Sequence, residues 1–137
     1  MTLLDFARPF VGKVAERPGS QQNPFILWCH EFTSLKATDD ETPWCSAWLN
    51  MLCALLGRPR SDSAAAISWG VIGAPRPLSE ALPGDDICVF KRTGGHHVAI
   101  FLRYNGARIT VIGGNQSNNV TVADFPRADL LHVRRLL

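Results

Sequence analysis

The sequence predicts a single α+β domain with an antiparallel sheet, because helical patterns fill the first half of the chain and strand patterns the second. Apolar residues recur in steps of three and four as far as residue 69, and the later part has short apolar runs bounded by turn residues. A length of 137 residues is ordinary for one domain, and it is enough to bury a core without metal or disulfide staples.

Four helices are expected along the chain: three short ones and a longer one, which comes third. Residues 3–11 form an amphipathic pattern that Pro9 weakens. Asn23 and Pro24 combine an N-cap residue with a proline suited to the first helical position, so a helix of about ten residues is expected to start there. Residues 61–69 predict another short helix, which Gly70 would stop.

The central helix is expected to begin near residue 42. Thr42 is a good N-cap, and Pro43 suits the first helical position. Gly57 would end the helix just beyond its last turn. The apolar side chains between these points fall on one helical face: Cys45, Trp48, Leu49, Leu52, Cys53 and Leu56. We expect this face to pack on the sheet.

Strand patterns follow a turn at residues 83–85. They cover residues 87–91, 97–104, 107–113, 120–123 and 131–135. Asn105 and Gly106 mark a hairpin turn between the second and third of these strands. A two-residue turn would pair His96 with Asn115, whereas a three-residue loop would put His97 on the same face as Asn115. Both registers are compatible with the sequence.

Composition argues against several classes of protein. A formal charge of +2 gives no basic stripe for nucleic acid, and no apolar run approaches the roughly 18 residues that cross a membrane. The four cysteines form no C-x-x-C pair, which disfavours a zinc site. Cys29 and His30 are a poor ligand pair, because adjacent side chains diverge. We expect no metal and reduced thiols.

Cys45 is the candidate nucleophile. In the first turn of its helix, unpaired N–H groups and the helix dipole favour an anion, so we expect a lowered thiol pKa. The same N–H groups could stabilise an oxyanion on an attacked carbonyl. The alternative is that Cys45 is a small buried apolar residue, as most free cysteines are. Cys29, Cys53 and Cys88 are interpreted as core residues.

The candidate bases are His96 and His97, which open a strand directly after two glycines. Only one of them can face the helix, because successive strand side chains alternate. His30 is expected on a helix surface, and His132 lies near the C-terminus. Asn115, at the end of the partner strand, is the candidate group that orients the imidazole, and Gln116 is its neighbouring alternative.

Five segments, in order, resemble small CHAP-like and NlpC-like peptidoglycan hydrolases, especially the phage-type ones. Residues 38–50 are similar to their nucleophile segment, and residues 95–100 to their histidine strand. The other similar segments are residues 18–24, 83–87 and 113–118. The resemblance therefore covers most of the chain.

This resemblance implies a papain-like fold, in which the nucleophile helix packs on an antiparallel sheet. It makes Cys45 the nucleophile, His97 the base and Asn115 the orienting residue, since the family histidine directly precedes a valine. His96 is the alternative base, because this chain has two histidines where the family has one. Asp40, Trp44 and Gln116 are further candidates for contacts with substrate or oxyanion.

The resemblance also implies an activity. We expect a single catalytic domain over residues 1–137 that cleaves an amide bond in the stem peptide of peptidoglycan, as a monomer and without a cofactor. A non-catalytic wall-binding or peptide-binding module on the same fold is the alternative, and so is a transacylase or deamidase with the same three residues.

Two settings fit such a hydrolase. The first ten residues lack the basic and apolar regions of a signal peptide, so we expect a cytoplasmic location in the producing cell. Action in the periplasm or cell wall would then follow release through a phage holin, or injection as an antibacterial effector. An effector would have an immunity protein as partner.

Overall fold

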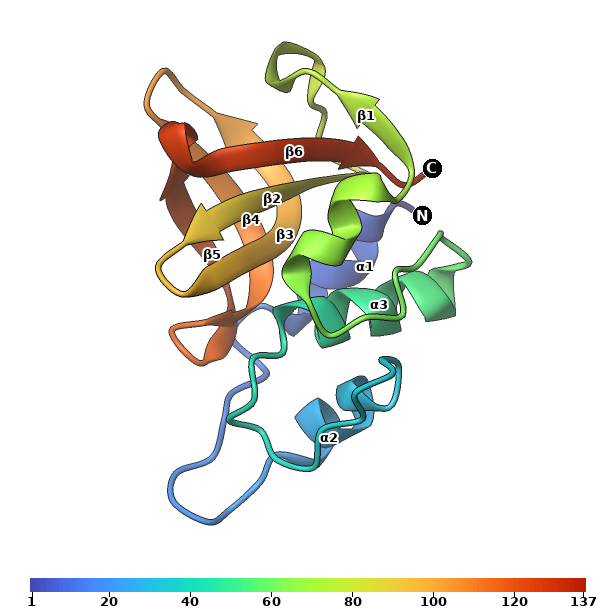
Figure 1. The fold of residues 1–137 in the computed structure, drawn as a ribbon, viewed down its shortest axis with the longest axis vertical. Coiled ribbons are helices and arrows are strands. Elements are labelled where there is room, and N and C mark those ends of the chain that lie inside the picture. The colour runs from blue at the N-terminus through green and yellow to red at the C-terminus, as the bar shows by residue number, and fades with distance from the viewer.

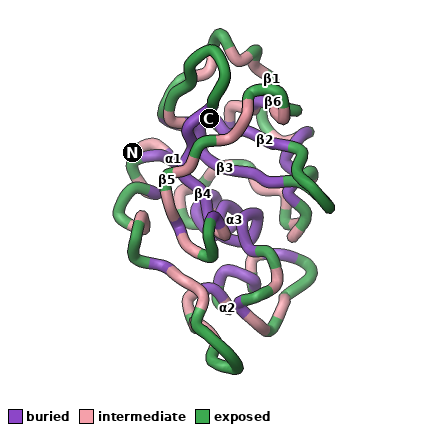
Figure 2. The backbone as a smooth tube through the Cα atoms, turned by 90° about the vertical axis from the view of Figure 1, so that its left-hand side faces the viewer, coloured by how far each residue is buried: buried purple, intermediate pink, exposed green.

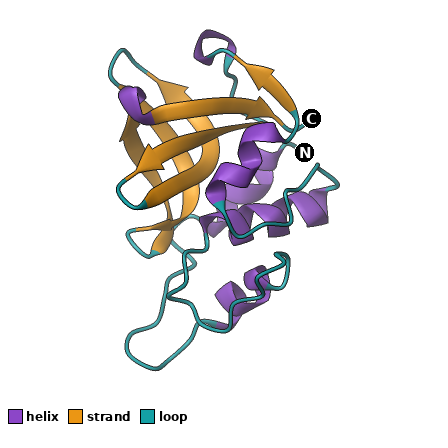
Figure 3. Cartoon of the chain, in the orientation of Figure 1, coloured by secondary structure: helices purple, strands orange, loops and turns teal.

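A computed structural model describes all 137 residues as an α+β fold with a six-stranded antiparallel sheet (Figures 1 and 3). The predicted fold class is therefore confirmed at this level. The helices are α1 (Leu3–Ala7), α2 (Pro24–His30) and α3 (Cys45–Leu56), with 3₁₀ helices η1 (Arg8–Phe10), η2 (Ala66–Val71), η3 (Leu78–Glu80) and η4 (Arg127–Asp129). None of the helices is long and apolar enough to cross a membrane.

The strands are arranged in the order β1-β6-β2-β3-β4-β5. Their bounds are β1 (Ala74–Arg76), β2 (Asp86–Arg92), β3 (Gly95–Tyr104), β4 (Arg108–Gln116), β5 (Asn119–Pro126) and β6 (Leu130–Arg135). All five predicted strands are present. The sequence pattern missed β1, because this edge strand is only three residues long and contains Pro75.

Side chains cap the starts of α1 and α2, and the helix ends differ from the sequence pattern. Asn23 caps α2 as predicted, since its Oδ1 accepts a hydrogen bond from the Phe25 N–H at 2.9 Å. The helix ends at His30 after seven residues, which is shorter than expected. His30 is buried, so its predicted place on a helix surface is wrong. The predicted helix at residues 61–69 is a 3₁₀ helix that starts later and runs past Gly70.

Next to its loop the hairpin between β3 and β4 adopts neither predicted register, whereas the pairs Ile100–Ile112 and Phe101–Val111 further along match the register expected for a three-residue loop. The Asn105 side chain accepts hydrogen bonds from the backbone N–H groups of Ala107 (3.1 Å) and Arg108 (3.0 Å), which holds a longer loop. Tyr104 pairs with Ile109 next to the loop, and the register shifts again further along the hairpin. His96 therefore does not pair with Asn115.

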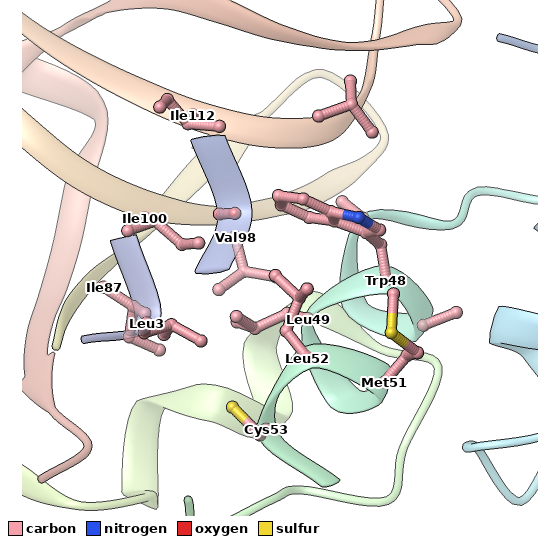
Figure 4. Close-up of a cluster of buried hydrophobic side chains, with 14 of the residues drawn as sticks. Leu3, Trp48, Leu49, Met51, Leu52, Cys53, Ile87, Val98, Ile100 and Ile112 are labelled. Carbon is pink, nitrogen blue, oxygen red and sulfur yellow. The ribbon is translucent and has the colours of Figure 1, made fainter. Parts of the chain in front are cut away.

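Two cores cover the two faces of the sheet. The larger lies between the sheet and α1, α3 and η2, where Val98, Ile100 and Ile112 of the strands meet Trp48 and Leu49 of α3 (Figure 4). The smaller covers the opposite face and is made of Cys88, Phe90, Ala99, Phe101, Ile109, Val111 and Val133. Full burial of a side chain such as Leu or Phe contributes about 1.5–3 kcal/mol, so both cores hold the sheet in place.

Helix α3 is buried on every side from Cys45 to Cys53, beyond the single predicted face. It lies between the sheet and α2, which covers its outer side (Figures 1 and 2). Trp48 Nε1 on this helix is buried without a partner. Ser46 anchors the helix: its Oγ donates to the Ser63 carbonyl oxygen at 2.6 Å and accepts from Trp69 Nε1 at 2.8 Å. The start of α3 is therefore rigidly placed against the sheet.

Candidate active site

Helix α3 starts three residues after Thr42, later than the sequence pattern predicts. The Asp39 carboxylate accepts hydrogen bonds from the backbone N–H groups of Glu41 (3.0 Å) and Thr42 (2.6 Å), so this segment forms a turn. Thr42 therefore does not cap the helix. Trp44 is the N-cap residue, and no side chain caps the first turn. Cys45 is the first helical residue, where backbone N–H groups have no partner within the helix.

A pocket of about 370 Å³ opens beside the start of α3. This volume lies within the range of small-ligand sites. Three parts of the chain surround Cys45 there: residues 64–67 before and in η2, the turn between β2 and β3, and the end of β4. The lining residues are Pro43, Cys45, Ala64, Ala65, Ala66, Ile67, Arg92, Thr93, Gly94, Gly95, His96 and Asn115.

Burial dominates the protonation of the Cys45 thiol, since the residue is only 4% exposed. Desolvation raises its pKa above the ordinary value for cysteine, although the backbone N–H groups of Val98 and Ser46 and the charge of Arg92 act in the opposite direction. The expectation of a lowered thiol pKa is therefore wrong. The resting side chain is a protonated thiol that needs a base before it can act as a nucleophile.

The two histidines of β3 point to opposite faces of the sheet. Val98, which follows them, faces α3 in the larger core (Figure 4). His97 lies on the other face, where its ring stacks on Phe125 with ring centroids 4.9 Å apart. The expectation that His97 faces Cys45 is therefore wrong, because the sheet separates the two side chains.

His97 and Gln116 form a buried pair on that far face. His97 Nε2 lies 2.9 Å from Gln116 Oε1, and Gln116 Nε2 donates to the Thr121 carbonyl oxygen at 2.8 Å. Burial lowers the His97 pKa to about 4, although the hydrogen bond to Gln116 acts in the opposite direction. The ring is therefore neutral at pH 7, and Nε2 carries the proton because it faces an acceptor. Gln116 does not line the pocket, so its predicted contact with substrate or oxyanion is not formed.

His96 is exposed and lines the pocket together with Cys45. It occupies the position on β3 that alternates with Val98, so both lie on the face that α3 covers. No hydrogen bond joins the Cys45 thiol to either histidine ring. In proteins without bound substrate, catalytic hydrogen bonds are often long and tighten only in the substrate complex.

Asn115 reaches the pocket because a β-bulge interrupts β4. The register with β5 shifts between Gly113 and Gln116, and Asn115 adopts the left-handed conformation with a φ of 57°. Asparagine tolerates this conformation more readily than most residues. Gly114 packs on Trp44 of the α3 side. The bulge therefore keeps Asn115 on the pocket side and turns Gln116 to the far face.

Asp40 and Trp44 are buried and do not line the pocket. The Asp40 carboxylate accepts hydrogen bonds from the backbone N–H groups of Arg17 and Asn23, both at 2.8 Å. Trp44 Nε1 donates to Glu16 Oε2 at 2.9 Å. Their predicted contacts with substrate or oxyanion are therefore not formed. Both residues instead tie the loop at residues 15–23 to the segment before α3.

Sequence reasoning missed two parts of the pocket wall. Arg92 ends β2 just before the two glycines, and its place in the strand–glycine–histidine segment was the available signal. The three alanines and Ile67 at residues 64–67 carry no signal, because their composition fits an ordinary short helix.

No protein-family model matches the chain, and no curated protein matches it. No three His, Cys, Asp or Glu side chains come together in a group that could hold a metal ion. The groups that could carry chemistry at this site are Cys45, His96 and Asn115, which line one pocket.

Proposed function

We propose that this chain is a cysteine hydrolase of papain-like architecture that cleaves an amide bond in the stem peptide of bacterial peptidoglycan. One observation carries the proposal: a cysteine at the first position of a buried helix shares a pocket with a histidine and an asparagine. Nucleophile, base and orienting group are the three parts that a thiol mechanism needs. The wall substrate is supported by the family resemblance of the sequence.

The proposed reaction begins when His96 accepts the thiol proton and the Cys45 sulfur attacks the substrate carbonyl carbon. The resulting oxyanion is stabilised by the free N–H groups at the start of α3. The protonated His96 then gives its proton to the departing amine, which leaves a thioester on Cys45. Water, deprotonated by His96, hydrolyses the thioester and restores the thiol.

Asn115 would orient the His96 ring in this mechanism. A side-chain amide that binds one ring nitrogen fixes the tautomer, so that the other nitrogen faces the sulfur. The bulge in β4 supports this role, because it places Asn115 on the lining of the pocket that also holds His96.

A non-catalytic peptide-binding module is the second candidate. It is favoured by the 4% exposure of Cys45 and by the absence of a hydrogen bond from its thiol to a histidine.

Either function fits the two biological settings of a phage lysin and an injected effector. A neighbouring holin gene would support the first setting, and a neighbouring immunity gene the second.

Digestion of purified peptidoglycan tests the proposal. We expect wild-type protein to release new amines, detected by mass spectrometry of the soluble fragments, and Cys45→Ala to release none. Cys53→Ala is the matched control, because that cysteine is buried in the core away from the pocket and should retain activity. Wall binding without released amines would establish the binding module instead.

A further inference from the structure

The pocket holds one permanently charged side chain, Arg92, and no acidic one. His96 is the only other ionisable lining group besides the thiol of Cys45. A pocket of this composition has a positive potential, which favours a negatively charged ligand.

Arg92 is also unpaired within the protein. Three other arginines are held by carboxylates: Arg58 by Asp85, Arg60 by Asp62 and Arg135 by Asp86. Further arginines are also unpaired, but among the arginines only Arg92 lines the pocket. Arg92 makes no ion pair and no side-chain hydrogen bond, although it is exposed at the pocket rim. Its guanidinium group therefore has all five N–H donors free for a ligand.

The charge of Arg92 acts close to the reacting group. Burial raises the pKa of the Cys45 thiol, and the charge of Arg92 acts against this rise, so its electrostatic effect extends to the start of α3. Residues 64–67, three alanines followed by Ile67, also line the pocket. The alanine methyl groups form an apolar surface that a small apolar side chain of a ligand, such as that of alanine, can contact.

We propose that Arg92 binds a free carboxylate next to the scissile amide, so that the pocket selects acidic, alanine-containing peptides over neutral ones. The planar guanidinium group matches a carboxylate with two parallel hydrogen bonds, which a neutral carboxamide cannot reproduce. This inference rests on the proposed function, because it places the scissile amide of a wall peptide in the same pocket. The inference adds that a stem peptide is a substrate only if this carboxylate is free and not amidated.

Binding to a non-cleaving protein tests this inference. The probes are two synthetic alanine-containing stem peptides that differ only in one α-carboxylate or α-carboxamide group, titrated calorimetrically into Cys45→Ala protein. A charge-assisted hydrogen-bonded pair contributes about 1.5–3 kcal/mol, so we expect the carboxylate peptide to bind about 10–100-fold more tightly. Adding Arg92→Gln should remove this difference and leave binding of the carboxamide peptide unchanged within about twofold.

Lys91→Gln in the same Cys45→Ala background is the matched control. Lys91 is an exposed cation beside Arg92 that does not line the pocket, so it should leave the preference in place. The role of Arg92 would be overturned if the two peptides bound equally or if neither bound. It would also be overturned if Lys91→Gln removed the preference for the carboxylate peptide as fully as Arg92→Gln does. A wild-type protein that cleaves both peptides equally would also refute it, while leaving the proposed hydrolase intact. Binding preference without cleavage would refute the hydrolase alone.

Discussion

His97 is fully buried, and its ring stacks on Phe125, which also stacks on Phe90 with ring centroids 4.9 Å apart. Its Nε2 is paired with Gln116, and its Nδ1 has no partner. Protonation would place an uncompensated charge among aromatic side chains, which explains why the His97 pKa falls to about 4. A residue that the sequence suggested as a catalytic base is thus a neutral part of the core.

This burial predicts a loss of stability in acid. The unfolded chain binds a proton at His97 near pH 6.5, whereas the folded protein binds it only near pH 4. The unfolded state therefore holds more protons in this window, so the free energy of unfolding falls as pH decreases. We expect His97 alone to reduce it by about 2 kcal/mol between pH 7 and pH 5, measured by urea unfolding.

The substitution His97→Gln should flatten this pH dependence, because it removes the group that titrates. His96→Gln is the matched control and should keep the dependence, since that side chain is exposed. A wild-type protein equally stable at both pH values would show that His97 is not held neutral by its surroundings.

Strand β3 was only partly predictable from the sequence. Sequence patterns identified the strand, its two histidines and Asn115 on the next strand. They could not decide which histidine faces α3, because a shift of one residue reverses every side chain of a strand. That decision depends on the Asn105 loop and on the bulge before Gln116, and neither has a reliable sequence signal.

The alternation along β3 predicts different effects of its two histidines on activity. His96→Ala should lower kcat on peptidoglycan fragments by about 10²–10⁴-fold, the usual contribution of a general base. His97→Gln should leave kcat per folded molecule within about threefold, because its ring lies behind the sheet. Activity is measured by amine release and the folded fraction by circular dichroism. Full activity in His96→Ala with none in folded His97→Gln would return the role of base to His97.

For the molecule as a whole, sequence reasoning was most successful where physical patterns are local. The order of helices and strands and the α2 cap at Asn23 depend on periodicity and capping, which a sequence displays directly. The two cores, the burial of α3 on all sides and the β1 edge strand depend on contacts between distant segments. The protonation of Cys45 was misjudged for the same reason, since its burial is a tertiary property.

Asp85 joins three such distant segments. Its carboxylate accepts hydrogen bonds from the Leu3 N–H at 3.0 Å and from Arg58 Nε at 2.9 Å, and its backbone carbonyl oxygen accepts one from the Leu136 N–H at 2.9 Å. The N-terminal helix and the residue after the end of α3 therefore meet at the Asp85 side chain, and the C-terminal residues bind its backbone. Both termini lie close together (Figure 1). Only 9% of the Asp85 side chain is exposed, so solvent screens this pair weakly.

Asp85→Ala should therefore lower the free energy of unfolding by about 2–3 kcal/mol, because it leaves the Arg58 charge and the Leu3 N–H without a partner. Glu31→Ala is the matched control. It removes a pair with Lys36 whose two side chains are mostly exposed, and it should cost less than about 1 kcal/mol. Urea unfolding at pH 7 measures both losses. Activity at 25 °C should be unchanged in Asp85→Ala, since Asp85 does not line the pocket. Equal losses in the two variants would mean that the Asp85 side chain contributes no more to the free energy of unfolding than an exposed surface pair.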